Sequence, residues 1–241
     1  ISTPEDTPLY EKLLGDGSRI GVKFSYKVQD TPRGLADAFI LGEEFIGDDS
    51  VCLILGDNVF YGQDMTRVLR SAMAVKEGAT VFGYPVKDPS AFGVVEFDEN
   101  RKVVSIEEKP KVPKSNYAVT GLYFYPAGVS AKAKEVKPSD RGELEITTLN
   151  EFYLDDGKLD VQLLGRGFAW LDTGTMDSLA DASDFVRVIQ KRQGVEISAP
   201  EEIAYKNGWI SRDELLDSAA KYGKSSYGQH LKNVAEGKLK D

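Results

Sequence analysis

The chain has 241 residues, of which 41% are hydrophobic and 29% are charged. That composition is ordinary for a globular protein, and a chain of this length can fold without disulfides or a structural metal. The formal net charge of −9 argues against a nucleic-acid partner, because such binding depends mainly on Lys and Arg contacts to phosphate. No stretch approaches 18 apolar residues and no signal peptide is evident, so we expect a cytoplasmic protein with no membrane partner.

Strand-like segments rich in β-branched and aromatic residues recur along the chain, at 22–28, 51–55, 79–86, 93–97, 103–107, 117–125, 159–164 and 167–171. Segments with helical periodicity cover 35–45, 64–77, 143–154 and 176–193, and shorter ones follow at 201–207, 212–221 and 228–237. This alternation predicts an α/β fold with a Rossmann-like mixed, mostly parallel sheet and helices on both faces. The β-rich part over 81–125 could form a lid.

We expect residues 1–241 to form a single domain, in which residues 200–241 are a helical C-terminal appendage. The start Ile1-Ser2-Thr3-Pro4 reads like the end of a strand that leaves a sheet, so we expect an N-terminal segment to precede it. The single cysteine, Cys52, lies in the apolar run VCLIL and is expected to be buried. The single histidine, His230, is far in sequence from any candidate nucleophile and is interpreted as a surface residue.

The most informative feature is a pair of aspartates that each follow an apolar run. VCLIL leads into Gly56-Asp57, and GFAWL leads into Asp172. Carboxylates at strand ends lie where open α/β sheets bind ligands, and two of them can converge on one Mg²⁺ that also holds substrate phosphates. A turn or helix-capping role explains each aspartate taken alone.

Two further segments suit phosphate or sugar recognition. The segment 29–38 joins a strand to a helix, and Gly34 opens that helix, where a backbone can approach a ligand closely. Glu108 and Lys109 follow another strand, where a carboxylate could accept hydrogen bonds from sugar hydroxyls and a lysine could neutralise phosphate. Ordinary turns and helix caps also explain both segments.

Taken together and in order, a series of motifs resembles the sugar-nucleotidyltransferase family. They are QDTPRGLADAF, LILGDN, AFGVVEFD, EEKP, SNYAVTGLYFY, RGELEIT and WLDTGT, and the resemblance covers the whole chain. It implies Mg²⁺-dependent nucleotidyl transfer from dTTP to α-D-glucose 1-phosphate, which gives dTDP-glucose and pyrophosphate at the start of dTDP-rhamnose synthesis. It also implies in-line attack without a protein nucleophile, a sugar-binding part within the β-rich segment, and a homotetramer.

The resemblance assigns roles to individual residues. The catalytic group would be Asp57, Asp172 and Lys109, and the metal ligands would be the two aspartates. The nucleotide would be bound by Gln29, Pro32, Gly34, Leu35 and Asp57. The sugar phosphate would be bound by Gly93, Glu108, Lys109, Val119 and Trp170, with Arg141 and Glu143 as supporting residues nearby. A regulatory nucleotide site would include Tyr61 and Gly62.

The sequence departs from the family pattern in two places. Phe92 stands where the family usually has tyrosine, so a hydroxyl contact to the sugar is expected to be absent. The family also opens with a strand and the loop GGSGTRL, followed by a lysine, and none of these precedes Ile1. Without them the triphosphate would lack the loop amides, and the sheet would lack a central strand.

Three alternatives stay open at this point. The chain could be a truncated, non-catalytic subunit that still binds sugar nucleotides. It could be a related enzyme that uses UTP. It could also be a doubly wound domain for hydride transfer, although no GxGxxG motif is present.

Overall fold

The computed structural model describes residues 1–100 and 102–239. The chain divides into two compact units, one formed by Ile1–Asp30 with Ala180–Asp241 and the other by Thr31–Leu179. The C-terminal tail thus belongs to the same unit as the start of the chain. No helix in the described part is long and apolar enough to cross a membrane.

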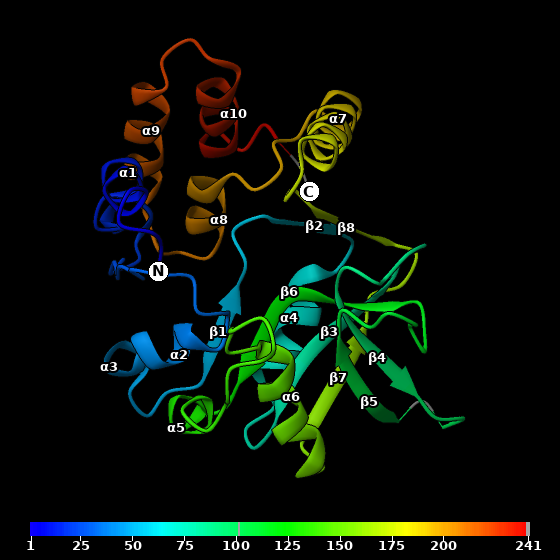
Figure 1. Ribbon diagram of the computed structural model, residues 1–241. Coiled ribbons are helices and arrows are strands. Elements are labelled where there is room, and N and C mark those ends of the chain that lie inside the picture. The colour runs from blue at the N-terminus through cyan, green and yellow to red at the C-terminus, as the bar shows by residue number, and fades with distance from the viewer. Residues whose placement is uncertain (101, 240–241) are drawn as a thin grey trace. The chain divides into compact units, whose positions relative to one another are not determined.

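The unit of residues 31–179 is built around a six-stranded sheet (Figure 1). Its strands follow the order β5 (Val103–Glu108), β4 (Gly93–Phe97), β6 (Tyr117–Tyr125), β3 (Ala79–Pro85) and β7 (Leu159–Leu163), and β1 (Val51–Ile54) also pairs with β6. The mixed α/β architecture is confirmed. The strand directions differ from the expectation, since β3 and β7 are parallel whereas the other pairs are antiparallel. The reason is that β6 runs opposite to β1, β3 and β4, and short turns join β4, β5 and β6.

A second sheet has two strands, β2 (Asn58–Gly62) and β8 (Phe168–Asp172), which pair antiparallel. The sequence pattern predicts β8 but no strand directly after Asp57. All five residues of β2 are only half-buried, so this strand has no marked apolar pattern and is defined by its pairing with β8. That pairing joins two segments that are far apart in the sequence.

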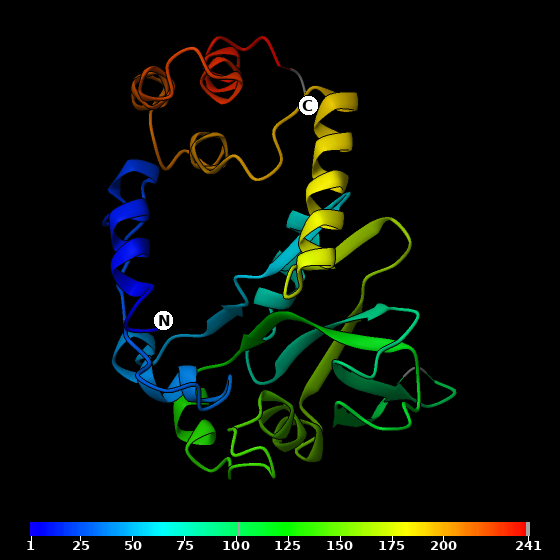
Figure 2. The same cartoon turned by 45° about the horizontal axis from the view of Figure 1, so that its top comes forward.

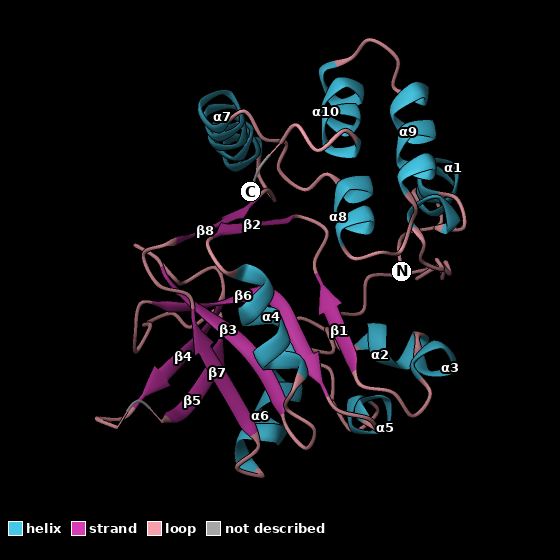
Figure 3. Ribbon diagram, turned by 180° about the vertical axis from the view of Figure 1, so that it is seen from behind, coloured by secondary structure: helices cyan, strands magenta, loops and turns pink. Residues whose placement is uncertain are grey.

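Helices cover both faces of the larger sheet, as predicted. Figures 1 and 3, which view the molecule from opposite sides, show α4 (Met65–Met73) and α6 (Ile146–Asp155) on opposite faces. Ala72 of α4 packs in one apolar cluster with Phe82, and Leu149 of α6 packs in another with Val81. Successive side chains of a strand point to opposite faces, so these neighbouring residues of β3 serve both helices.

The remaining helices of this unit are short. The predicted helix over 35–45 is divided at Gly42 into α2 (Asp37–Leu41) and α3 (Glu43–Ile46), and α5 (Val129–Ala133) follows β6. Helix α7 (Met176–Gln193) has the predicted bounds and includes the point where the two units divide. Figure 2 shows it as one continuous helix.

The other unit is helical. It contains α1 (Thr7–Leu14), a 3₁₀ turn at Ser18–Ile20, α8 (Pro200–Lys206), α9 (Arg212–Lys221) and α10 (Ser226–Ala235). Its core is formed by Ala204, Ile210, Leu215, Ala219, Leu231, Val234 and Ala235. The strand predicted over 22–28 is wrong: within the described residues this segment makes only an isolated bridge, between Val28 and Ser2.

Two single-residue predictions are also wrong. His230 is 8% exposed, and its Nε2 lies 2.5 Å from Oε2 of Glu202, because α10 turns this side chain toward α8. Cys52 is exposed. The reason is that burial alternates along β1. Val51 and Leu53 are half-buried, whereas Cys52 lies on the exposed face together with Ile54, which is 62% exposed.

Candidate active site

The pairing of β2 with β8 brings the two predicted aspartates to the same end of this two-stranded sheet. Asp172 is the last residue of β8 and lies opposite Asn58, which follows Asp57 directly. The backbone amide and the hydroxyl of Thr173 both donate to the carbonyl oxygen of Asp57, at 2.8 and 2.9 Å. These two bonds hold the segments after β1 and after β8 together.

The carboxylates of Asp57 and Asp172 converge beside Gly174. A Cβ atom at Gly174 would lie 2.9 Å from Oδ1 of Asp172 and 3.9 Å from Oδ2 of Asp57. The amide of Gly174 donates to Oδ1 of Asp172 and the side-chain amide of Asn58 donates to Oδ1 of Asp57, both at 2.7 Å. Within the described residues, Oδ2 of each aspartate accepts no hydrogen bond, so both oxygens can meet a ligand.

This donor set fits one magnesium ion. Mg²⁺ dehydrates reluctantly and is usually held by one or two carboxylates together with substrate phosphates, not by a closed protein cage. In the described part of the chain, no group of three or more His, Cys, Asp or Glu side chains is placed to hold a metal. An open site made by Asp57 and Asp172 therefore remains the candidate for a divalent cation.

A second group of predicted residues meets around Gly93. Gly93 of β4 lies opposite Glu108 of β5 in the strand register. A Cβ atom at Gly93 would lie 3.5 Å from Oε2 of Glu108, 3.7 Å from Cβ of Val119 and 3.2 Å from Oγ1 of Thr147. Thr147 also donates a hydrogen bond to Glu108. Sequence reasoning did not single out Thr147, because a threonine in the first turn of a helix has an ordinary explanation.

Arg141 lies among three carboxylates next to this group. Its Nη2 is 2.8 Å from Oε1 of Glu145, 3.5 Å from Oε1 of Glu108 and 3.6 Å from Oε2 of Glu143. The hydrogen bond with Glu145 raises the pKa of Arg141 above its ordinary value, with a smaller opposing effect of burial. Arg141 and Glu143 thus lie beside Glu108, whereas the buried Glu145 was missed because it reads as an ordinary residue before a helix.

Trp170 lies between the two groups. It is 9% exposed, and its indole Nε1 donates to Oδ1 of Asn58. Its ring packs edge-on against Phe92, with 5.0 Å between ring centroids. The Phe92 carbonyl accepts from the amide of Lys109, which is exposed and has no side-chain partner in the described residues. The role of Trp170 as a wall of the sugar pocket stays a prediction.

Electrostatics also links the aspartate pair to the Gly93 group. Burial raises the pKa of Tyr123 strongly, and the carboxylates of Glu108 and Asp57 raise it further. Both carboxylates therefore act on the same buried phenol. Asn58 also links the two groups, because its amide contacts both Asp57 and Trp170. That these residues form one substrate site stays a prediction.

The predicted nucleotide-binding residues fall in both units. Gln29 belongs to the unit with the N-terminus, where its backbone N–H donates to the carbonyl of Ser2, and Pro32, Gly34 and Leu35 belong to the other. Gly34 has a φ of 96°, and a Cβ there would lie 2.5 Å from the carbonyl oxygen of Leu144. Close backbone packing thus explains this glycine, and the nucleotide-binding roles stay predictions.

The predicted regulatory residues Tyr61 and Gly62 end strand β2. Gly62 lies opposite Phe168, and a Cβ at Gly62 would clash with the Phe168 ring. Packing within the two-stranded sheet accounts for the glycine. The regulatory role of this pair stays a prediction.

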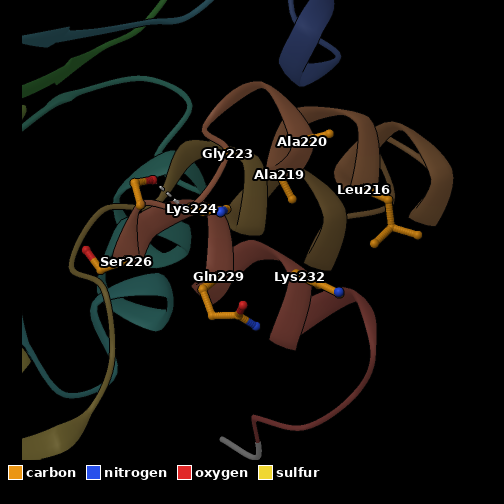
Figure 4. A pocket seen from close by; sticks show the side chains of 10 residues that line it. Leu216, Ala219, Ala220, Gly223, Lys224, Ser226, Gln229 and Lys232 are labelled. Carbon is orange, nitrogen blue, oxygen red and sulfur yellow. Dashed lines mark hydrogen bonds between the residues drawn. The ribbon is translucent and has the colours of Figure 1, made fainter.

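One surface pocket lies in the helical unit, between α9 and α10 (Figure 4). It has a volume of about 520 Å³, and Ala219 and Ala220 from α9 and Gln229 and Lys232 from α10 line it. None of its described lining residues was predicted from the sequence to be functional.

Comparison with known proteins identifies the family of the chain. The family model described as "Nucleotidyl transferase" matches residues 1–188. The chain is 58% identical over 231 residues to a glucose-1-phosphate thymidylyltransferase from Neisseria meningitidis, covering 96% of this chain and 80% of the relative. It is 51% identical over 236 residues to the enzyme of that name from Mycobacterium tuberculosis, covering 98% of this chain and 82% of the relative.

Solved structures show the same similarity. A crystal structure from Bacillus anthracis, assigned as a glucose-1-phosphate thymidylyltransferase in complex with a sucrose, has a TM-score of 0.70 and 44% identity, and the match covers 77% of this chain and 74% of that one. A UDP-glucose pyrophosphorylase complexed with UDP-glucose has a TM-score of 0.58 and 24% identity over 68% of this chain and 65% of that one, which shows a shared fold alone. The chain therefore belongs to the nucleotidyl transferase family and is an enzyme for nucleotidyl transfer to a sugar 1-phosphate.

Proposed function

We propose that the protein transfers a thymidylyl group from dTTP to α-D-glucose 1-phosphate, with Mg²⁺ as cofactor, as the first step of dTDP-rhamnose synthesis. The observation that carries this proposal is the convergence of Asp57 and Asp172 beside Gly174, with Asn58 hydrogen-bonded to both Asp57 and Trp170. The name shared by the relatives supplies the choice of sugar phosphate and of the thymidylyl group.

In the proposed reaction, a phosphate oxygen of glucose 1-phosphate attacks the α-phosphorus of dTTP. The new oxygen–phosphorus bond forms as the bond from the α-phosphorus to its bridging oxygen breaks, and pyrophosphate leaves. No protein nucleophile is needed, so catalysis depends on positioning and on charge stabilisation. A divalent cation held by Asp57 and Asp172 would supply positive charge to the phosphate oxygens.

The remaining side chains would position the sugar phosphate. Glu108 would accept hydrogen bonds from sugar hydroxyls, since Thr147 and Arg141 already fix its carboxylate. The exposed ammonium group of Lys109 would offset phosphate charge. Trp170 would form the apolar wall, with Phe92 packed against it.

A pyrophosphate-release assay tests the substrate pair. The purified chain is incubated with dTTP, UTP, ATP or GTP and with several sugar 1-phosphates, with Mg²⁺ or with EDTA. We expect release to be fastest with dTTP and glucose 1-phosphate and to stop in EDTA. Faster release with UTP would favour the UTP-using alternative, and sugar-nucleotide binding without any release would favour the non-catalytic one.

Variants of the aspartates test the site itself. Asp57→Asn and Asp172→Asn are each expected to lower kcat by about 100-fold or more, because removing one preorganised electrostatic group commonly costs that much. Asp184→Asn is a matched control, since this carboxylate is 74% exposed and, among the residues that the structure describes, pairs only with Arg187 on its own helix. Full activity in either aspartate variant would contradict the proposal.

A further inference from the structure

We propose that Asn58 is a positioning residue that couples the carboxylate of Asp57 to the indole of Trp170. The inference rests on the proposed function, because it assigns these two side chains to the cation site and to the wall of the sugar pocket. It predicts that removing the carboxylate of Asp57 weakens the hydrogen bond that the indole of Trp170 donates to Asn58.

The hydrogen bonds of Asn58 have only one possible direction. Its Oδ1 accepts from the backbone amide of Gly121 at 2.9 Å and from Nε1 of Trp170 at 2.5 Å. Its Nδ2 donates to Oδ1 of Asp57 at 2.7 Å. An indole and a backbone amide can only donate, and an ionised carboxylate can only accept, so rotating the amide group by 180° would oppose all three bonds.

The surrounding backbone leaves this amide little freedom. A Cβ atom at Gly121 would lie 2.6 Å from Oδ1 of Asn58, so strand β6 approaches the amide as closely as a glycine permits. Asn58 lies opposite Asp172 in the register, and Trp170 is two residues before Asp172. Side chains two residues apart on a strand share a face, which places Asn58 and Trp170 within diagonal reach across the pair.

Hydrogen bonds that share one amide polarise one another. The negative charge of Asp57 draws on the N–H of Asn58 and so makes Oδ1 a better acceptor for Trp170. When that charge is removed or neutralised, the bond from the indole should weaken. By linkage, a sugar that changes this bond at Trp170 must also change the affinity of Asp57 for a cation.

Indole N–H signals in a ¹H–¹⁵N NMR spectrum measure this coupling directly. The chain has two tryptophans, Trp170 and Trp209, and the Trp209→Phe variant identifies the two signals. We expect Asp57→Asn to shift the Trp170 signal upfield and to leave the Trp209 signal in place. We expect Asn58→Ala to shift the Trp170 signal further upfield, and Asp57→Asn to cause no further shift once Asn58 is alanine.

A second variant guards against loss of folding in Asn58→Ala. The double variant of Asp57→Asn with Asn58→Asp keeps an oxygen for Gly121 and Trp170, and it reverses the direction of the hydrogen bond between positions 57 and 58. A charged acceptor strengthens the bond from the indole, so the Trp170 signal should move downfield, opposite to the effect of alanine. A merely space-filling role for Asn58 predicts no such reversal.

An unmoved Trp170 signal in Asp57→Asn would overturn the proposal. An undiminished shift in the background of Asn58→Ala would overturn it as well, because the charge would then act without the amide. These spectra need neither dTTP nor sugar phosphate. A negative pyrophosphate-release assay would therefore count against the proposed function and leave the coupling through Asn58 to be judged on its own result.

Discussion

At the scale of single residues, the site depends on glycines that leave room for other side chains. Gly174 allows the carboxylates of Asp57 and Asp172 to converge, and Gly93 leaves space between Glu108 and Thr147. Neither glycine has a positive φ, so close approach and not backbone freedom explains them. An added methyl group would act on the site more than on the fold.

We predict that Gly93→Ala raises the KM for glucose 1-phosphate about tenfold, which corresponds to about 1.4 kcal/mol. The added Cβ would lie 3.2 Å from Oγ1 of Thr147, which forces the threonine or the sugar to move. Steady-state kinetics measures the change. Gly165→Ala is the matched control, because a Cβ there meets nothing within 4 Å. Equal kinetics in the two variants would show that Gly93 does not border the sugar phosphate.

At the scale of elements, polar pairs join the helices of the smaller unit. Glu202 of α8 contacts His230 of α10 at 2.5 Å and Lys206 of its own helix at 2.9 Å. Burial by itself would raise the pKa of Glu202, but the hydrogen bonds from Lys206 and His230 outweigh it and hold the pKa below its ordinary value. The ionised carboxylate therefore stabilises this helix packing.

The pH dependence of stability follows from that shift. Since the pKa of Glu202 is lower in the folded state, its contribution is complete above the unfolded value of about 4.3 and is lost as the pH falls through the folded value. We predict that Glu202→Gln lowers the free energy of unfolding at pH 7 by about 1–2 kcal/mol, because it weakens the pairing of the buried His230. The variant should also lose less stability than the wild type below pH ~4.3.

Urea denaturation at several pH values between neutral and acidic measures both effects. Asp217→Asn serves as the control, since this exposed carboxylate of α9 has no partner among the described residues. A parallel pH profile for wild type and Glu202→Gln would mean that Glu202 does not titrate differently on folding.

At the scale of the whole molecule, we propose a cytoplasmic homotetramer. Light scattering coupled to size-exclusion chromatography should then give about four times the chain mass of 26.5 kDa. Exposed leucines on α1, such as Leu9 and Leu13, add apolar surface that an oligomer could cover. A mass equal to one chain at micromolar concentration would contradict the tetramer.

The sequence by itself determined the helices and strands with strong patterns and the identity of the acidic pair. The long run of α7 and the apolar strand β6 have the predicted bounds, because periodicity and β-branched content act locally. The motifs also single out Asp57 and Asp172, whose carboxylates lie together in the candidate site. Periodicity, β-branched content and short motifs all depend only on residues that are close together in the sequence.

Only the tertiary structure decided how distant segments meet. Strand β2 exists because β8 pairs with it, and that pairing brings Asn58 to Trp170 and the two aspartates to Gly174. The same is true of His230, whose burial depends on a helix elsewhere in the chain. A hydrogen bond across the sheet has no local signature in the sequence, because its two partners are neighbours only after the chain has folded.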